Sequence, residues 1–292
     1  MTYRTILAPL CGSETDRSAL AMAFSVAQTF SGHVDALFLR TDPSESILML
    51  GDGFPASIID ALLRTTAAAI RVRATQARAA FDAAASSAHA VIVDSPTPPG
   101  RLTARWRERV GVPSETVIEE ARVVDLLVFD RSIMTDDSLD HHIVEMALLY
   151  GTRPVLIAPG PLESAAGGRL GTHVAIAWNG RSESARAVAA AMPFLMKAQS
   201  VRVLTAETAK TRLTEAGRLV EYLAWCGVRA EAMVVGPDDE GVGAALAHHA
   251  EISGGDLLVM GGYGSNRMRE MFLGSVTRQV IERARLPVLI AH

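Results

Sequence analysis

Short apolar runs alternate with amphipathic segments throughout the second half of the chain. Five runs have the length and β-branched content of buried strands, namely HVAIAW, VRVLTA, RAEAMVV, DLLVM and PVLIA. The segments between them repeat apolar residues every three or four positions, as amphipathic helices do. In the first segment, from about Ser182, these residues are Ala185, Val188, Ala189 and Met192, and in the second they are Leu213, Leu219, Val220 and Leu223, with Gly227 as the C-terminal stop. The alternation predicts βαβ units around a parallel sheet.

The chain contains the same unit twice. The stretch ILAPLCGSETDRSALAMA in the first half aligns with AIAWNGRSESARAVAAA in the second when Cys11 is treated as an insertion. VVDLLVF then matches GGDLLVM, and GTRPVLIAP matches RARLPVLIAH, so three matches in the same order indicate duplication of a whole unit. Proline, glycine and serine fill the segment from Pro159 to Thr172 without periodicity. We therefore expect a linker there, between domains at residues 1–159 and 172–292.

The first half keeps both ends of this unit and changes its middle. Its second strand, HVDALFLR, precedes an insertion and then an alanine-rich helix from about Ser57 to Ala85. The later segment RLTARWRERVG places arginines around Trp106, which leaves two interpretations, an anion patch or a solvated excursion that packs its tryptophan. We favour the excursion. Each half is predicted to be a five-stranded parallel sheet with helices on both faces, which makes two tandem Rossmann-like α/β domains.

Composition and charge narrow the classes of function. Hydrophobic residues make up 49% and charged residues 21% of the 292 residues, which is typical of a globular chain with a sizeable core. The 28 basic and 32 acidic residues are scattered along the chain and give a net charge of −4. No basic stripe of the kind that binds nucleic acid is present in this sequence, so we expect no nucleic-acid partner.

The chain start and the cysteines exclude further classes. The opening MTYRTILAPL lacks the order of a signal peptide, and no apolar run reaches the roughly 18 residues of a membrane span. We therefore expect a cytoplasmic protein without a membrane partner. The two cysteines, Cys11 and Cys226, are far apart and form neither a disulfide framework nor a zinc spacing, so we expect them to be small buried apolar side chains.

A glycine-rich segment, GGYGSNRMREMFLGS, follows the fourth strand of the second half and leads into a helix. In doubly wound sheets the ligand crevice lies at this carboxyl edge. Gly261 and Gly264 would let backbone amides approach an anion in conformations that other residues avoid. Gly274 and Ser275 open the helix, whose amino end favours phosphate, and the hydroxyls of Ser275 and Thr277 add donors. Taken alone, the Gly-Gly pair after the strand could be a tight turn, and Ser275 could be an ordinary helix cap. The glycines and the helix start together favour a phosphate site.

The spacing of these residues resembles a family signature. Gly261, Gly264 and the step Gly274-Ser275 are similar to the G-x2-G-x9-G-(S/T) nucleotide-binding motif of universal stress proteins, and Val276 and Thr277 are similar to its usual continuation. The five-strand unit and its duplication fit the same family, with its adenine nucleotide alpha hydrolase-like fold. The resemblance covers essentially the whole chain, and it is specific in the second half and architectural in the first.

The resemblance implies a ligand and its contacts. The ligand would be an adenine nucleotide, either ATP, AMP or ADP, alone or with Mg, bound in the C-terminal domain. The glycines would hold its phosphates and ribose, and an acidic residue at the end of the first strand would contact the nucleoside, a position where this chain has Asn179. The implied contact residues are Asn179, Thr205, Ala206, Gly261, Gly264, Arg267, Gly274, Ser275, Val276 and Thr277.

The matching stretch of the first half, RSIMTDDSLDHHIVEMA, contains no glycine. Asp136, Asp137 and Asp140 would repel phosphate there, so we expect no nucleotide in the first domain. The same stretch invites a metal interpretation, but His141 and His142 would point about 100° apart on a helix. A solvated helix start is the favoured interpretation, and we expect no metal site.

Three functions remain open. The first is a tandem universal stress protein that uses its nucleotide as a regulatory ligand in a stress response, and the second is a nucleotide-free module that recruits protein partners. The third is an enzyme, at most a weak ATPase. Spacing alone assembles no nucleophile with a base, so we expect no catalytic residues. In each case the last strand, PVLIA, could pair across a pseudo-twofold axis or across the axis of a homodimer, since exposed strand edges favour such pairing.

Overall fold

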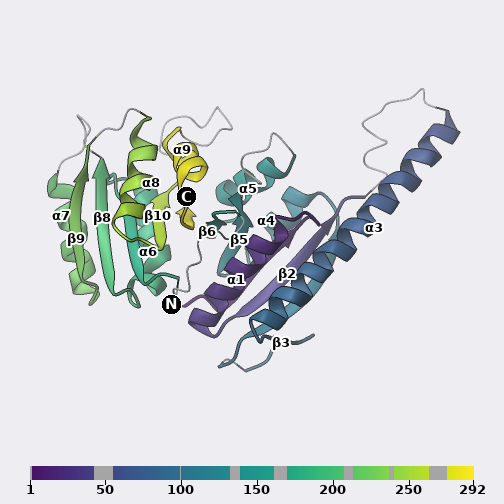
Figure 1. Ribbon diagram of the computed structural model, residues 1–292, viewed down its shortest axis with the longest axis horizontal. Coiled ribbons are helices and arrows are strands. Elements are labelled where there is room, and N and C mark those ends of the chain that lie inside the picture. Colours follow the sequence, from purple (N-terminus) through teal and green to yellow (C-terminus); the bar gives the residue numbers. More distant parts are fainter. Residues whose placement is uncertain are drawn as a thin grey trace.

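The strands of the described residues form one 11-stranded sheet, with the order β3-β4-β2-β1-β5-β6-β11-β10-β7-β8-β9. Figure 1 shows the computed structural model, which describes residues 2–42, 55–98, 100–131, 139–160, 170–206, 213–236, 240–262 and 275–292. The strands are β1 Thr5–Leu10, β2 His33–Arg40, β3 Val91–Ile92, β4 Thr103–Val110, β5 Leu126–Asp130, β6 Val155–Ala158, β7 His173–Ala177, β8 Ser200–Ala206, β9 Ala230–Val235, β10 Leu257–Gly261 and β11 Val288–Ala291.

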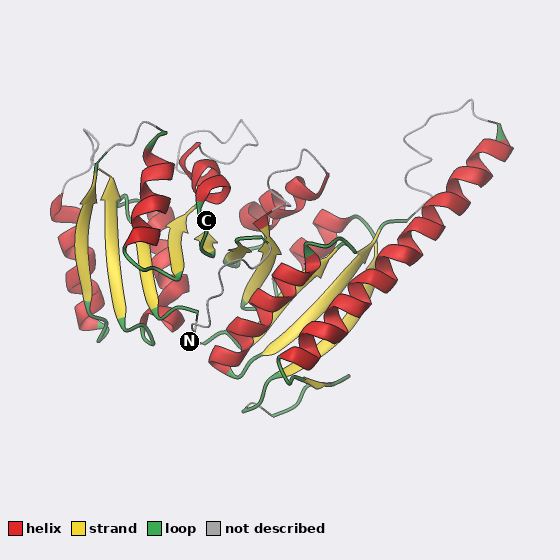
Figure 2. Ribbon diagram, in the orientation of Figure 1, coloured by secondary structure: helices red, strands yellow, loops and turns green. Residues whose placement is uncertain are grey.

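Helices cover both faces of the sheet (Figure 2). They are α1 Asp16–Phe30, α3 Ala56–Ser87, α4 Pro113–Ala121, α5 Leu139–Tyr150, α6 Ser182–Leu195, α7 Leu213–Trp225, α8 Val242–Ile252 and α9 Ser275–Arg283. One buried cluster contains side chains of α1, α3, α6 and α7, and a second contains side chains of α4, α5, α8 and α9. None of these helices combines the length and the apolar character that a membrane crossing requires.

The two halves of the chain use the same strand order. In both, the third strand lies beside the second, followed by the first, fourth and fifth, as β4-β2-β1-β5-β6 and as β9-β8-β7-β10-β11. Strands within each half are parallel, and the halves meet where β6 pairs antiparallel with β11, with Val155 opposite Ile290. The predicted α/β class is confirmed. Two separate five-stranded sheets are not found, because one sheet runs through both halves and the first half adds the two-residue strand β3.

Aromatic side chains join the halves beside this strand pair. Tyr3 packs against Phe30 and Phe194 with ring centroids 5.5 and 5.3 Å apart, and Phe30 meets Phe194 at 5.0 Å. The Tyr3 hydroxyl donates a hydrogen bond of 2.6 Å to the carbonyl oxygen of Ala190. Burial, and then the nearby charge of Asp125, raise the pKa of Tyr3 above its ordinary range, so the hydroxyl remains a donor at neutral pH. These contacts fix the orientation of one half against the other.

The structure corrects three expectations. The arginine-rich segment is not a solvated excursion but the regular strand β4, which lies beside β2. Within β4, Trp106 stacks on Phe38 with ring centroids 6.1 Å apart. The apolar stripe predicted on α6 is rotated, because Ala185 and Ala189 are exposed while a neighbouring set is buried, namely Ser184, Ala187, Val188, Ala191, Phe194 and Leu195. Both cysteines are free and half-buried rather than buried.

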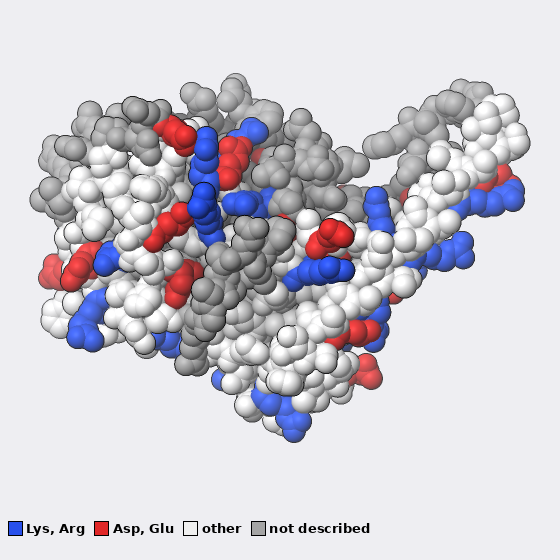
Figure 3. Space-filling model, in the orientation of Figure 1, with Lys and Arg blue, Asp and Glu red and all other residues white. Residues whose placement is uncertain are grey.

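The long helix α3 extends away from the sheet (Figure 1). It spans Ala56–Ser87, close to the predicted bounds, and its buried residues begin only at Ile70. In Figure 3 basic side chains follow the projecting arm with acidic ones beside them, and both signs are interspersed over the rest of the visible described surface. α3 packs on α1 through its C-terminal part, where Phe81 meets Phe24 and Trp106.

Candidate functional site

Three strand ends of the second half lie side by side at one edge of the sheet. Met260 of β10 pairs with Ala177 of β7, and Ala177 pairs with Leu204 of β8. The residues that follow are therefore neighbours, and Trp178 donates its backbone N–H to the Leu204 carbonyl at 2.8 Å. This edge brings the predicted Asn179, Thr205, Ala206 and Gly261 together.

Close packing against α6 explains why residue 261 is a glycine. A Cβ atom at Gly261 would lie 2.6 Å from the backbone carbon of Glu183 and the backbone nitrogen of Ser184, both in the first turn of α6. Gly261 forms the end of β10, opposite Ala291, and its φ does not lie in the left-handed range. The expectation that Gly261 needs a conformation forbidden to other residues is therefore wrong. Its lack of a side chain lets α6 approach the strand.

Asn179 holds a defined orientation beside α6. Its Oδ1 accepts the backbone N–H of Arg181 at 3.0 Å, and its Nδ2 donates to Glu183 Oε1 at 3.4 Å. Glu183 is 3% exposed and also accepts the hydroxyl proton of Ser182 at 3.3 Å. Each polar atom of the exposed Asn179 amide keeps capacity for one further hydrogen bond. The buried carboxylate of Glu183 therefore lies next to the Asn179 amide, at the position where the family resemblance implied an acidic residue.

Two buried polar atoms at this edge have no hydrogen-bond partner within the described part of the chain. They are Nε1 of Trp178, just after β7, and Oγ1 of Thr205, near the end of β8. Thr205 is 3% exposed. Thr205 follows Val201 and Val203 in the alternation of β8, so its side chain lies on the sheet face that α6 and α7 cover. Native structures seldom leave buried donors unpaired, and those that remain require a physical reason.

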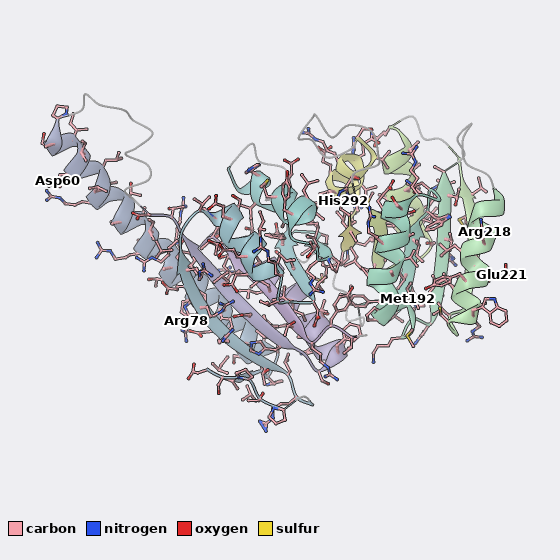
Figure 4. All side chains as sticks on the ribbon, turned by 180° about the vertical axis from the view of Figure 1, so that it is seen from behind. Asp60, Arg78, Met192, Arg218, Glu221 and His292 are labelled. Carbon is pink, nitrogen blue, oxygen red and sulfur yellow. The ribbon has the colours of Figure 1, made fainter. Side chains whose placement is uncertain are left out.

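An open groove between α6 and α7 begins at Trp178. Its volume is about 460 Å³, and it is lined by Trp178, Gly180, Ala185, Val188, Ala189, Arg218, Leu219 and Tyr222. The exposed face of α6 thus forms one wall, and Arg218 supplies a cation. Figure 4 shows this side, with Arg218 and Glu221 extending from α7 and Met192 on the neighbouring α6. The size suits a small organic ligand.

The helix that begins at Ser275 packs on the start of α8. The backbone N–H of Gly243 donates to Gln279 Oε1 at 3.1 Å, and a Cβ at Gly243 would lie 2.6 Å from the carbonyl oxygen of Val276. Ser275 and Val276 are exposed, and Thr277 is buried. The first amides of a helix have no partner within that helix and favour anions. The amino end of α9 is thus held firmly while Ser275 and Val276 face outward.

The predicted site residues are accounted for as follows. Asn179, Thr205, Ala206 and Gly261 share the strand edge, and Ser275, Val276 and Thr277 form the first turn of α9. The predicted Gly264, Arg267 and Gly274 lie outside the described residues. Sequence reasoning missed four residues, namely Trp178, Glu183, Arg218 and Gly243. Only Glu183 carried a signal, because it lies in the first turn of the helix that follows Asn179, where a carboxylate is favoured.

The matching edge of the first half is closed. The cavity there is about 20 Å³, lined by residues that include Cys11, Asp16 and Asp130. A Cβ at Gly12 would lie 2.4 Å from Cβ of Arg73, because α3 packs directly on the loop after β1. A space of this size holds about one water molecule. The predicted aspartates Asp136 and Asp137 lie outside the described residues, as do the side chains of Asp140 and His141.

The described residues contain no group of three His, Cys, Asp or Glu side chains that could hold a metal ion. The His248 and His249 rings are perpendicular and 5.8 Å apart, and His249 Nδ1 lies 2.9 Å from the Ala245 carbonyl oxygen within α8. His249 is therefore engaged with the backbone of its own helix.

Solved structures with the same fold extend over the whole chain. A universal stress protein from Archaeoglobus fulgidus DSM 4304 covers 100% of this chain and 99% of its own, with 15% identity and a TM-score of 0.69. A functionally unknown protein, PA1789, from Pseudomonas aeruginosa PAO1 covers 99% of this chain and 92% of its own, with 15% identity and a TM-score of 0.53. A universal stress protein in complex with cAMP has a TM-score of 0.30, too low to inform on a ligand.

Sequence comparison identifies the second half. Universal stress protein MJ0577 from Methanocaldococcus jannaschii is 32% identical over 84 residues, which are 29% of this chain and 44% of that protein. The match thus spans less than half the length of this relative. Residues 177–292, which hold the strand edge and the groove, match the model of the universal stress protein family. The second half of the chain thus matches the universal stress protein family in sequence, and the solved structures show the same fold over the whole chain.

Proposed function

We propose that this chain binds an adenine nucleotide at the carboxyl ends of β7, β8 and β10 and acts as a regulatory ligand-binding protein in a stress response. The ligand is ATP, ADP or AMP, alone or with Mg. The observation that carries the proposal is a pair of buried donors, Trp178 Nε1 and Thr205 Oγ1, that find no partner among the described residues and lie beside the open groove. Leaving such a group unpaired costs about 1–3 kcal/mol, so two at one edge favour a functional site over a purely structural one.

Each part of the edge suits one part of a nucleotide. The Asn179 amide has one donor and one acceptor position left, which suits the paired hydroxyls of ribose. The first turn of α9, from Ser275 to Thr277, suits phosphate, together with Gly264, Arg267 and Gly274 of the signature. The apolar wall of the groove at Val188 and Ala189 suits the flat face of a base.

The first half takes no nucleotide in this proposal. Its equivalent edge holds the buried Asp16 and Asp130 around a cavity of about 20 Å³. The first half instead completes the fold as the second member of an internal pseudo-dimer, joined to the nucleotide-binding half through β6 and β11. We place the protein in the cytoplasm, with a homodimer as a further level of assembly.

Thermal unfolding with and without Mg-ATP tests the proposal. A ligand at about 100 times its dissociation constant stabilises the native state by about 2.7 kcal/mol, which corresponds to a rise in Tm of roughly 5–10 °C for a protein of this size class. The informative variant is Thr205→Val, which removes the unpartnered hydroxyl and keeps the shape of the side chain. Without ligand it should unfold at or slightly above the wild-type temperature, because it removes an unpaired buried group.

The matched control is Thr29→Val. Thr29 is also buried, but its hydroxyl donates to the Ser25 carbonyl oxygen at 3.1 Å within α1. Thr29→Val should lower the unliganded Tm and keep the full ATP-induced rise, whereas Thr205→Val should lose much of that rise. Nucleotide binding at this edge is wrong if ATP, ADP and AMP all leave the wild-type Tm unchanged, or if the two variants respond to ATP equally.

A partner-recruiting module is the second candidate, because large apolar side chains are exposed near the groove. Trp225 is 85% exposed, Met196 66% and Tyr222 50%. Trp225→Ala should then leave the Tm unchanged and abolish capture of any partner that wild-type protein retains. Phosphate release from ATP, measured on the same samples, should remain at the level of a protein-free control if the nucleotide is a ligand and not a substrate.

A further inference from the structure

A second cavity lies at the opposite, amino ends of β1, β2 and β4 in the first half. Its volume is about 470 Å³. Its walls are the first residues of these strands, the segment that joins β3 to β4 and the end of α4. In Figure 1 this region is found by the label β3, at the lower edge of the molecule. The nucleotide edge is in the other half of the chain and at the other ends of its strands.

Four arginines and two carboxylates line this cavity, namely Arg4, Arg101, Arg105, Arg107, Asp35 and Glu120. Asp35 binds Arg105 at 2.9 Å and Arg107 at 2.7 Å, and Glu120 binds Arg107 at 2.6 Å. Both carboxylates are buried, and these ion pairs, together with one from Arg109 to Glu120 at 2.8 Å, satisfy them. The charged groups in the lining carry two more positive than negative charges.

Within the described residues, some guanidinium N–H groups at this cavity bind no carboxylate. Arg101 is exposed and forms no hydrogen bond or ion pair within the described residues. Arg105 uses Nε and one terminal nitrogen on Asp35, which leaves its other terminal nitrogen available. The Arg4 guanidinium donates through Nη1 to the carbonyl oxygens of Phe30 and Ser31, at 3.2 Å each, and the Arg4 backbone N–H donates to Asp125 at 2.7 Å. A guanidinium with unused N–H groups is suited to carboxylate or phosphate.

The second half shows that the fold does not require these charges. Thr5 of β1 pairs with His33 and His173 of β7 pairs with Ser200, so Asp35 corresponds to Arg202, two residues on. The strand partner of Asp35 is Arg105, whereas the partner of Arg202 is Glu231. The position that matches Arg107 is occupied by Met233. The two halves keep the strands and reverse or remove the charges, so the arginine cluster is a feature of the first half alone.

The other wall of the cavity is apolar. It contains Val93, Pro96, Pro98, Val123 and Val124, from the β3–β4 connection and the segment after α4. A cavity with cations at one side and aliphatic groups at the other suits a molecule with a charged head and an apolar body. We propose that it binds a small organic anion, with a carboxylate or phosphate headgroup at Arg101 and Arg105.

Isothermal titration with three probes tests this site. The probes are phenyl phosphate, benzoate and inorganic phosphate. Wild-type protein should bind one of the two aromatic anions more tightly than inorganic phosphate, and the preference between them identifies the headgroup. In Arg101→Gln the affinity for the preferred probe should fall about tenfold, as for the loss of a hydrogen bond to a charged group. Arg186→Gln, which removes an exposed arginine of α6, is the control and should bind like wild type.

Two further variants distinguish binding in this cavity from binding elsewhere on the protein. Thr97→Trp places a large side chain in the cavity from an exposed loop position and should abolish binding without lowering the Tm. Thr205→Val should not change the affinity, because its edge is in the other half, so failure of the nucleotide proposal leaves this result intact. Absence of binding by wild type to all three probes would overturn the proposal, as would equal affinities of the Arg101 and Arg186 variants or full binding by Thr97→Trp.

Discussion

Replacing Gly261 by alanine tests whether the first glycine of the signature is structural. The added Cβ would lie 2.6 Å from two backbone atoms of α6 and 2.7 Å from Cγ of Glu183. Ordinary carbon contacts begin near 3.4 Å, so the overlap is about 0.8 Å. Backbone atoms cannot rotate away from the new methyl group. Either the first turn of α6 or the end of β10 must therefore shift.

The cost follows from the energetics of overpacking. Extra methyl groups in well-packed interiors cost about 1–3 kcal/mol, and the rigid backbone contact places Gly261→Ala near 3 kcal/mol. A loss of this size lowers the Tm by roughly 6–12 °C. Urea unfolding followed by circular dichroism measures it directly as a lower midpoint. Gly262→Ala should cost less, about 1 kcal/mol, because its Cβ would approach one side-chain methyl, Cγ2 of Ile290 at 2.9 Å, and no backbone atom closer than 3.9 Å.

Gly217→Ala is the matched control with the opposite sign. Gly217 is an exposed residue inside α7, with no atom within 4 Å of the position of an added Cβ. The substitution should stabilise the protein by about 0.5–1 kcal/mol, because alanine favours helix over the unfolded chain. A midpoint for Gly261→Ala equal to that of wild type would refute the close-packing argument. Ligand contact would then be the reason for the glycine.

Three further predictions concern stability. Asp35→Asn should lower the free energy of unfolding by about 1–3 kcal/mol at pH 7. Burial raises the pKa of Asp35, but hydrogen bonds from Arg107 and Arg105 outweigh burial and hold the pKa below its usual value. Its contribution is complete above about pH 3.9 and is lost as pH falls through the lower folded pKa, so the difference between wild type and variant in urea titrations should shrink below pH 3.9, and a constant difference from pH 3 to pH 7 would contradict this. Phe194→Ala should cost about 3–5 kcal/mol in the same titrations by opening the aromatic contact between the halves, and a loss below 1 kcal/mol would show that the contact is dispensable. Gly12→Ala should lower the Tm by several degrees, because Gly12 has a φ of 80° and its Cβ would lie 2.4 Å from Cβ of Arg73, and a wild-type Tm would exclude this contact with α3.

Periodicity and duplication predicted most of the fold. The five apolar runs of the second half became β7 to β11, and the two PVLIA runs became the antiparallel pair β6 and β11. Strand β4 was missed because its arginines are typical of a solvated segment. Their partners, Asp35 and Glu120, lie 70 and 13 residues away along the chain from the arginines that bind them. Local sequence cannot show that pairing, and the strand becomes recognisable only with the tertiary ion pairs.

The site was predicted by residue type more than by geometry. Strand ends follow directly from the run boundaries, so Asn179, Thr205 and Gly261 were placed at one edge correctly. The groove was not predicted, because the buried face of α6 was assigned one position away from the true one. Alanines fit either face of a helix, and only the larger Phe194 and Leu195 decide which side packs inward. The exposed Ala185 and Ala189 then become the wall of the groove.

The two halves differ in structure at both the carboxyl and the amino ends of their strands. At the carboxyl ends, α3 closes the first half by packing Arg73 against Gly12, whereas the second half has two buried donors without a partner among the described residues, beside a groove. At the amino ends, the first half has an arginine-lined cavity, and the second half replaces Asp35 and Arg105 by the reversed charges Arg202 and Glu231. Since both halves retain the same strand order, these differences are not demands of the fold. The two proposed sites therefore lie where the halves differ: the nucleotide at the carboxyl edge of the second half, and the organic anion at the amino edge of the first.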